Sequence, residues 1–258
     1  MKLVCLTNDD GPYSIGLQKL AEKISERQNL VVVTPNAQRS ATGKSLTLNR
    51  PLRVLENHEI NGYRLITHDG TPADSVVLAD SMLEEIELFV SGINAGGNLG
   101  YQSLLTSGTV GAAMEAALKG YPALAVSMEA GADDWFNPNG PRRSYEIVCD
   151  LTMTVINKIL NKGLPLGIDL LNLNFPCETN RDTVIEITRP SRVRMRNEVE
   201  ERIDPHGRTY YWFRGVEVAG KEGLDVHTVL EKNKASLSPI VLDCISEKHM
   251  QDLKSFMS

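Results

Sequence analysis

The chain has 258 residues, with 27 Lys and Arg against 33 Asp and Glu, and a formal net charge of −6. Aromatic residues make up 5% of the chain, which argues against a base-stacking surface, and the acidic balance argues against binding a long nucleic acid through its backbone. A single nucleotide held through a metal is compatible with this charge. A chain of this length can bury a sizeable core without disulfides, as one large α/β domain or two small ones.

The four cysteines, Cys5, Cys149, Cys177 and Cys244, are dispersed along the chain. No pair has the spacing of a metal or redox motif, so we expect buried thiols and not disulfides. The first residues lack the apolar region of a signal peptide, and no apolar stretch is long enough to span a bilayer. A cytoplasmic protein is therefore the expectation.

The first strand of the chain ends in an acidic turn. An apolar run over residues 3–6 predicts a strand buried on both faces, and Asp9 and Asp10 follow it directly, before a helical pattern over residues 15–28. Ligands bind at the carboxyl edge of such sheets, and two adjacent carboxylates repel each other unless a cation or proton lies between them. The alternative is an ordinary acidic turn that caps the next helix.

Polar loops follow two further buried strands, at residues 35–43 and 91–100. The first loop contains Ser40, and the second contains Asn94 among four glycines and two asparagines in ten residues. Glycines let a backbone come close to a ligand, and Asn offers a neutral oxygen to a cation. A surface connection and a tight turn are the alternatives, but a third special loop after a buried strand favours function.

Ser107, Gly108 and Thr109 begin a strong helix predicted over residues 109–119. Such a start offers free backbone N–H groups, two hydroxyls and the positive end of a helix dipole, which together predict an anion site. Thr109 as a plain N-cap is the alternative.

The remaining pattern predicts alternating strands and helices. A turn-rich segment over residues 133–141 is either a mobile lid or a plain loop. The expected elements are half-exposed, partly antiparallel strands over residues 45–55 and 63–67, a helix over 72–83 capped by Thr71, a buried strand over 123–128, a helix over 144–162, strands over 169–175 and 184–188, a short helix over 224–230, a strand over 237–241 and a C-terminal helix.

Beyond residue 189 the chain changes character. The alternation of Arg192, Arg194 and Arg196 with less charged residues predicts an exposed strand with one basic face, and residues 208–218 read as an arm of a hairpin with four consecutive aromatics. These aromatics suggest an oligomer contact. The simplest organisation is one α/β domain over residues 1–258, with a core of about residues 1–188 and a hairpin arm and C-terminal tail beyond it.

Oxygen donors follow three of the predicted buried strands: Asp9 and Asp10, Ser40, and Asn94. They share one sheet edge if those strands are parallel, and this hard-oxygen set suits Mg²⁺ or Mn²⁺. An anion site at the helix start near residue 107 would lie close by. Phosphate-ester hydrolysis uses such a pair of sites, because a metal and N–H groups together neutralise the phosphoryl oxygens.

Five motifs, in this order, resemble those of the SurE survival protein family of metal-dependent 5′-nucleotidases. They span about the first half of the chain, and the second half resembles the family only in style. A departure is Thr106, where many relatives have Tyr. The motifs are Thr7-Asn8-Asp9-Asp10-Gly11, Arg39-Ser40-Ala41, Gly70-Thr71-Pro72-Ala73-Asp74, Ser91-Gly92-Ile93-Asn94 with Gly97-Asn98-Leu99-Gly100, and Ser107-Gly108-Thr109-Val110-Gly111-Ala112-Ala113.

The resemblance implies a three-layer α/β/α Rossmann-like fold with a mostly parallel sheet, a protruding β-hairpin arm and a C-terminal oligomerisation segment. It implies a homodimer or homotetramer formed through the arm and the tail. It also implies one divalent cation, Mg²⁺ or Mn²⁺, per subunit. The implied metal ligands are Asp9, Asp10, Ser40 and Asn94, and the implied phosphate contacts are Asn98, Ser107, Gly108 and Thr109.

The implied reaction is hydrolysis of nucleoside 5′-monophosphates by in-line attack of a metal-activated water. Asp9 or Asp10 would be the general base, and the sequence leaves the choice open. Asp9 as a covalent nucleophile is less favoured, because halo-acid-dehalogenase-type phosphatases have their acid/base Asp two residues later, where this chain has Gly11.

Two rival functions fit parts of the sequence. A nucleotide-dependent transferase or dehydrogenase on a similar sheet would need a glycine-rich turn after the first strand, where this chain has carboxylates. A metal-dependent nucleotide-binding module without turnover would share every ligand residue and differ only in lacking catalysis.

Overall fold

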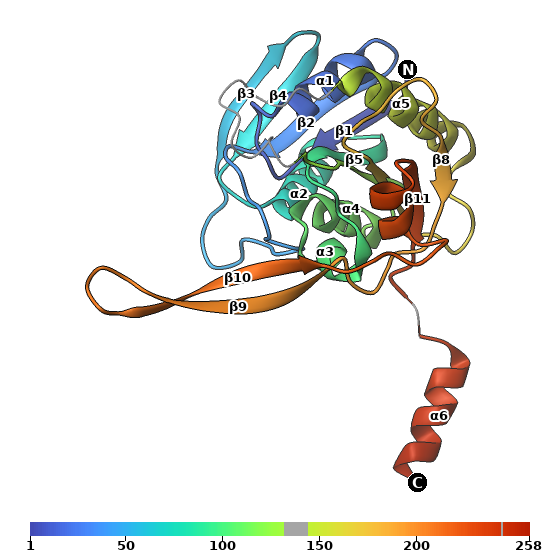
Figure 1. The fold of residues 1–258 in the computed structure, drawn as a ribbon. Coiled ribbons are helices and arrows are strands. Elements are labelled where there is room, and N and C mark those ends of the chain that lie inside the picture. Colours follow the sequence, from blue (N-terminus) through green and yellow to red (C-terminus); the bar gives the residue numbers. More distant parts are fainter. Residues whose placement is uncertain (132–143, 244) are drawn as a thin grey trace.

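A computed structural model describes residues 1–131, 144–243 and 245–258; the segment interpreted as either a lid or a plain loop, residues 133–141, lies outside them. Nine strands form one sheet in the order β3-β4-β2-β1-β5-β6-β7-β11-β8, with helices on both faces (Figure 1). The bounds are β1 (Leu3–Thr7), β2 (Asn29–Pro35), β3 (Val54–Ile60), β4 (Tyr63–His68), β5 (Ile86–Ala95), β6 (Ala123–Met128), β7 (Leu170–Phe175), β8 (Ile185–Ile187) and β11 (Ala235–Ile240).

The centre of the sheet is parallel. Strands β4, β2, β1, β5, β6 and β7 run in the same direction, while β3 pairs antiparallel with β4 and β11 pairs antiparallel with β7. The expected mostly parallel α/β sheet is therefore confirmed. Its carboxyl edge receives the loops that follow β1, β2 and β5, which are neighbours in the sheet.

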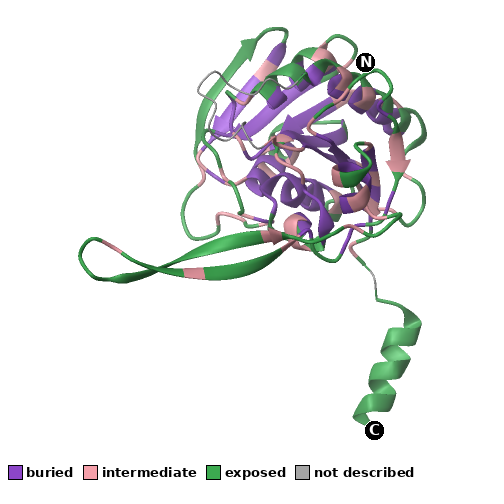
Figure 2. Ribbon diagram, viewed as in Figure 1, coloured by how far each residue is buried: buried purple, intermediate pink, exposed green. Residues whose placement is uncertain are grey.

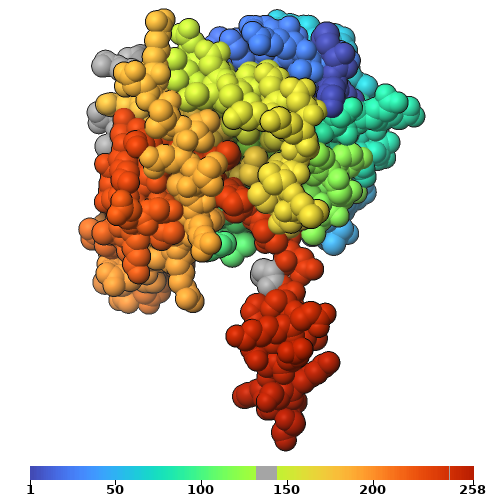
Figure 3. Space-filling view, turned by 90° about the vertical axis from the view of Figure 1, so that its right-hand side faces the viewer, coloured from blue at the N-terminus to red at the C-terminus, as the bar shows by residue number. Residues whose placement is uncertain are grey.

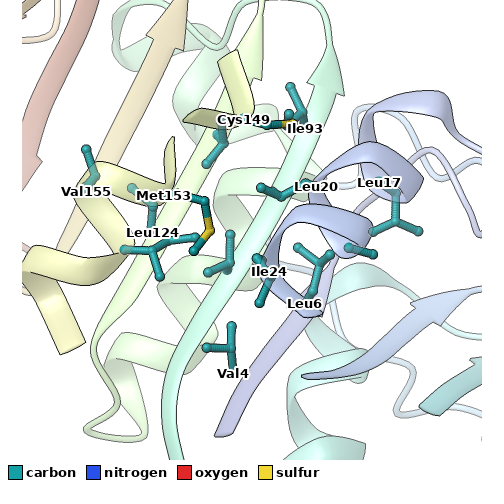
Figure 4. Packing of buried hydrophobic residues seen from close by; sticks show 14 of the residues in the cluster. Val4, Leu6, Leu17, Leu20, Ile24, Ile93, Leu124, Cys149, Met153 and Val155 are labelled. Carbon is teal, nitrogen blue, oxygen red and sulfur yellow. The ribbon is translucent and has the colours of Figure 1, made fainter. Parts of the chain in front are cut away.

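Side chains of β1 alternate between two apolar layers. Val4 and Leu6 belong to the cluster that packs against α1 (Ile15–Ser25) and α5 (Tyr145–Lys162), as Figure 4 shows. Cys5 points to the opposite cluster, which includes residues of α2 (Pro72–Met82) and α4 (Gly108–Leu118). Burial on both faces explains why the strand is a continuous apolar run, and it produces a three-layer α/β/α sandwich.

The segment before β3 differs from its prediction. Residues 45–53 form no strand, and β3 begins only at Val54. The backbone N–H and the hydroxyl of Thr47 donate to the two carboxylate oxygens of Asp74, at 3.0 and 2.6 Å. These bonds to a side chain replace strand pairing.

Two helices also differ from their predictions. Helix α1 ends at Ser25, three residues before its predicted end, and the short helix predicted over residues 224–230 is a π-helical segment, η1 (His227–Glu231).

Two elements stand away from the sandwich. Strands β9 (Met195–Ile203) and β10 (Thr209–Glu217) form an antiparallel hairpin, the hairpin arm, which projects from the body (Figure 1), and most of its residues are exposed (Figure 2). Helix α6 (Glu247–Met257) has no buried residue and stands clear of the body (Figure 3). None of the helices in the described residues is long and apolar enough to cross a membrane.

Candidate functional site

A cavity of about 340 Å³ lies at the carboxyl edge of the sheet, where the loops after β1, β2 and β5 meet. The four residues implied as metal ligands all line it, as do two of the four residues implied as phosphate contacts. Further lining residues come from α3 (Gly100–Thr106), the end of β6 and the base of the hairpin arm. The lining includes Asp9, Asp10, Gln38, Ser40, Asn94, Gly97, Asn98, Thr106, Ser107, Glu129 and Arg194.

Asn8 fixes the acidic turn from inside. Its fully buried side chain donates to the carbonyl of Gly11 at 3.0 Å and accepts from the Gly11 N–H at 3.1 Å and from the Thr34 hydroxyl at 2.6 Å. Gly11 has a φ of 87°, a conformation that a side chain disfavours. The turn is thereby held against β2, and the two carboxylates that precede Gly11 have a defined direction.

The Asp9 side chain, which follows β1, is buried against the start of α4. The Thr109 hydroxyl donates to Asp9 Oδ1 at 2.5 Å, and the Arg39 N–H donates to the Asp9 carbonyl at 2.6 Å. Gly108 leaves no room for a side chain, because a Cβ there would lie 2.9 Å from the Asp9 Cβ. The carboxylate therefore packs directly on the first turn of the helix.

Burial, and then the charge of the neighbouring Asp10, raise the pKa of Asp9 to about 6, although hydrogen bonds from Thr109 oppose the shift. An ionised carboxylate in such a place needs a counter-charge. A divalent cation beside both carboxylates would supply it. The electrostatics of the turn thus fit a metal site and are less well explained by an ordinary helix cap.

The neutral donors keep oxygens available for a cation. Asn94 donates its amide N–H to the carbonyl of Gly96 at 2.6 Å, which leaves its Oδ1 to accept. Ser40 Oγ accepts from Gln38 at 3.0 Å, and Asp10 Oδ2 accepts from the Ala95 N–H at 3.2 Å. The described residues contain no cluster of three or more His, Cys, Asp or Glu placed to hold a metal, so the candidate set is two carboxylates with two neutral oxygens, which suits Mg²⁺ or Mn²⁺.

The residues implied as phosphate contacts divide into two groups. Ser107 lines the cavity and is the N-cap of α4, since its hydroxyl accepts from the Val110 N–H at 3.1 Å. The alternative of Thr109 as N-cap is therefore wrong. Thr109 is fully buried, and neither it nor Gly108 lines the cavity. Asn98 lines it, with its amide donating to the Ser127 hydroxyl at 2.8 Å and a second amide hydrogen remaining.

Sequence reasoning missed Arg194 as a residue of this cavity. The alternation predicted an exposed basic face for Arg192, Arg194 and Arg196, but Arg194 is only 8% exposed. Strand β9 begins only at Met195, so strand alternation does not apply to the residue before it. Its guanidinium turns inward to Glu129, at 2.7 Å, and no local pattern in the sequence indicates a partner 65 residues away.

Known proteins resemble this chain over nearly its whole length. The family model described as "Survival protein SurE" matches residues 4–197. The "5′-nucleotidase SurE" of Methanothrix thermoacetophila is 37% identical over 94% of each chain, and that of Archaeoglobus fulgidus is 41% identical over 93% of this chain and 91% of its own. The crystal structure of the SurE protein from Aquifex aeolicus superposes with a TM-score of 0.83 at 30% identity, covering 99% of this chain and 100% of the other.

Proposed function

Because the chain belongs to the survival protein SurE family and is a 5′-nucleotidase, we propose that it hydrolyses nucleoside 5′-monophosphates to nucleoside and phosphate in the cavity described above. The observation that carries this proposal is the paired carboxylate of Asp9 and Asp10, one of them buried, against the first turn of α4. A phosphoryl group needs positive charge on its oxygens and a base for the attacking water. The Asp9 and Asp10 carboxylates offer that base, and a cation held beside them would supply the positive charge.

Asp9, Asp10, Ser40 and Asn94 would hold one divalent cation, Mg²⁺ or Mn²⁺, per subunit. When bound, the cation neutralises phosphoryl oxygens and lowers the pKa of a coordinated water. Its donor set is supported by the raised pKa of Asp9 and by the amide oxygen that Asn94 keeps available.

The protein's own groups bind and orient the phosphate. The N-terminal end of α4 lies beside the cavity, and the positive end of its dipole favours an anion. Ser107 and Asn98 border this end of the cavity, while Thr109 acts indirectly by holding the Asp9 carboxylate. Either Asp9 or Asp10 takes the proton of the water that attacks phosphorus in line with the departing 5′-oxygen.

The test is phosphate release from a panel of nucleoside 5′-monophosphates, with and without Mn²⁺ or Mg²⁺, by the native chain and by Asp9→Asn. We expect metal-dependent release that falls by roughly 100-fold or more in Asp9→Asn, because both a donor and the local charge are lost. Asp150→Asn, which changes a half-exposed carboxylate on α5, is the control and should keep native activity.

Each rival function predicts a different outcome. Nucleotide binding without turnover under any metal would favour the binding module, and activity retained in Asp9→Asn would remove the acidic turn from the mechanism. An acyl-phosphate trapped on Asp9 would establish covalent catalysis. A dinucleotide-dependent enzyme is the weakest rival, because an acidic turn and not a glycine-rich turn follows β1.

We also propose that the chain works as a homodimer or homotetramer joined through the hairpin arm and the C-terminal tail. The support is their exposed apolar surface, which includes Trp212 at 60%, Phe213 at 82% and Phe256 at 83% exposed. Monomers rarely expose contiguous apolar patches to water.

A further inference from the structure

A buried ion pair closes one side of the candidate active-site cavity. Arg194 Nη2 donates to Glu129 Oε1 at 2.7 Å, and the two side chains are only 10% and 12% exposed. Arg194 directly precedes β9 of the hairpin arm, and Glu129 directly follows β6. The pair thus joins the base of the arm to the sheet edge that carries the proposed metal and phosphate residues.

The same arginine holds the glycine-rich loop. Arg194 Nη1 donates to the carbonyl of Gly97 at 3.2 Å. The preceding carbonyl, of Gly96, accepts from Asn94, and the following one, of Asn98, accepts from Asn172 at 3.0 Å. Three consecutive carbonyls are therefore oriented by three different parts of the chain, and the middle one depends on Arg194.

The other carboxylate oxygen of Glu129, Oε2, packs against the same residue, Gly97. A Cβ on Gly97 would collide with Glu129 Oε2 and lie 3.4 Å from Arg194 Nη1. The ion pair is therefore packed onto the bare Cα of Gly97, between Asn94 and Asn98 in sequence. A side chain at Gly97 would force the pair apart.

Backbone hydrogen bonds fix the base of the hairpin arm and join it to the end of the glycine-rich loop. The Val218 N–H donates to the Arg194 carbonyl at 3.0 Å, which closes the two strands of the arm, and the Tyr101 N–H donates to the Ser191 carbonyl at 2.8 Å. Gly100 packs against the backbone N of Arg194, since a Cβ there would lie 3.1 Å away. Arg194 is therefore fixed in position before any ligand binds.

Direct capture of phosphate is the competing role for Arg194. The geometry argues against it, because the bonds from Nη2 to Glu129 and from Nη1 to Gly97 hold the guanidinium against the protein, and the adjacent carboxylate neutralises its charge. Arg194 Nε and Glu129 Oε2 are inaccessible to solvent and have no hydrogen-bond partner among the described residues. Because these two atoms are closed off from solvent, neither is presented to a substrate, and the bonds that the pair does make orient other protein groups.

We propose that Arg194 and Glu129 are positioning residues for catalysis: together they clamp Gly97 and so set the separation of Asn94 from Asn98. This inference rests on the proposed function of the cavity, in which Asn94 meets the cation and Asn98 the phosphate. Catalysis is sensitive to misplacement, since a shift of about 1 Å can reduce the rate by about 100-fold.

The test compares Arg194→Met, Arg194→Lys and Glu129→Gln with Arg196→Met. Arg196 lies two residues further along the chain, in β9, and its side chain is 72% exposed, so its variant removes the same charge from a neighbouring position without touching the clamp. Melting temperature and light scattering establish that each variant folds and assembles. The readouts are kcat and KM for a nucleoside 5′-monophosphate, and Mn²⁺ affinity by titration calorimetry.

We expect Arg194→Met to lower kcat by roughly 10- to 100-fold with KM changed less than about threefold, and to weaken Mn²⁺ binding by roughly 10-fold or more. Arg194→Lys should recover part of the kcat, because an ammonium keeps the ion pair but cannot bridge two acceptors in the guanidinium geometry. Glu129→Gln should resemble Arg194→Met more weakly, and Arg196→Met should match the native protein.

Several outcomes would contradict the proposal that Arg194 and Glu129 position Gly97. Native kcat and native Mn²⁺ affinity in folded Arg194→Met, or equal losses in Arg194→Met and Arg196→Met, would show that the pair does not position the loop. A raised KM with unchanged kcat would assign Arg194 to direct phosphate binding. If Arg194→Met fails to fold, Glu129→Gln decides by the same criteria. If the native chain has no phosphatase activity, the proposed function fails, and Mn²⁺ affinity alone still decides whether the clamp exists.

Discussion

His68 is a fully buried imidazole at the end of β4, and both of its ring nitrogens are used. Nδ1 accepts from the Gly70 N–H at 3.1 Å, so Nε2 carries the hydrogen and donates to the Ser75 hydroxyl at 2.7 Å. Burial lowers the pKa of His68 from 6.5 to about 4, although Asp74 and Asp69 oppose that shift. A second proton would have to sit on Nδ1, against the N–H of Gly70.

Acid should therefore destabilise the protein through His68. Since the folded-state pKa lies below the unfolded value, the folded protein binds fewer protons, and stability that is present above pH 6.5 is lost as the pH falls towards 4. We expect this residue alone to remove about 3 kcal/mol of the free energy of unfolding by pH 4. Urea unfolding of the native protein and of His68→Asn should show a stability gap that narrows over this range, whereas a constant gap would contradict the assignment.

At this scale the sequence predicted residues at the carboxyl ends of buried strands. Asp9 and Asp10 follow β1, whereas Asn94 lies inside the end of β5, which extends into the segment predicted as a loop from residue 91. The three residues meet at one cavity because their strands are adjacent and parallel. Arg194 and Glu129 could not be predicted in the same way. Their pairing is set by how the arm base crosses the sheet edge, and that contact is tertiary.

The loop that carries Ser40 is an element held by close contacts with the end of α3 and with α4. The Gly43 N–H donates to the Thr106 carbonyl at 2.8 Å, and Lys44 forms an ion pair with Glu115 of α4. A Cβ on Gly111 would collide with the backbone of Gly43 and lie 2.8 Å from the Lys44 nitrogen. The position of Ser40 therefore depends on a helix residue that has no side chain.

Gly111→Ala should push this loop away from α4. We expect a loss of roughly 1–3 kcal/mol in the free energy of unfolding, the range typical of overpacking, together with weaker Mn²⁺ binding because Ser40 moves. Gly62→Ala is the control: Gly62 has a φ of 84° with nothing within 4 Å of a Cβ, so strain alone should destabilise it. The proposed anchoring is wrong if both variants bind Mn²⁺ as the native protein does.

Elements with strong periodicity were predictable, and those organised by side chains were not. Strand β6 and helix α5 lie where the apolar pattern predicts them, because the apolar residues that make the pattern are the ones buried in the core. Residues 45–53 alternate as a strand would, yet Asp74 takes the hydrogen bonds of Thr47 and prevents pairing. A carboxylate 27 residues away outweighs local propensity here, and the sequence gives no sign of it.

At the scale of the whole molecule, the hairpin arm leaves apolar side chains exposed in the part of the chain that the structure describes. Tyr211, Trp212 and Phe213 are 62%, 60% and 82% exposed, and Val199 and Ile203 on the paired strand are 61% and 68% exposed. Exposed aromatic and branched side chains in one continuous ribbon are typical of contacts between subunits. Arg194, at the root of this ribbon, is by contrast buried in the candidate active site.

Shortening the arm should therefore separate assembly from catalysis. Replacing residues 199–213 with an Asn-Gly turn joins Glu198 to Arg214, which are already paired across the hairpin, and leaves Arg194 in place. We expect light scattering to report a smaller assembly than for the native chain, with kcat within about threefold of native because the clamp on Gly97 is intact.

The double variant Trp212→Ser, Phe213→Ser keeps the arm's length and should shift the assembly in the same direction, which would identify the aromatic surface as the contact. An unchanged mass in both variants would remove the arm from the interface, and a smaller assembly with a kcat reduced by more than about tenfold would mean that catalysis needs the partner subunit as well as Arg194.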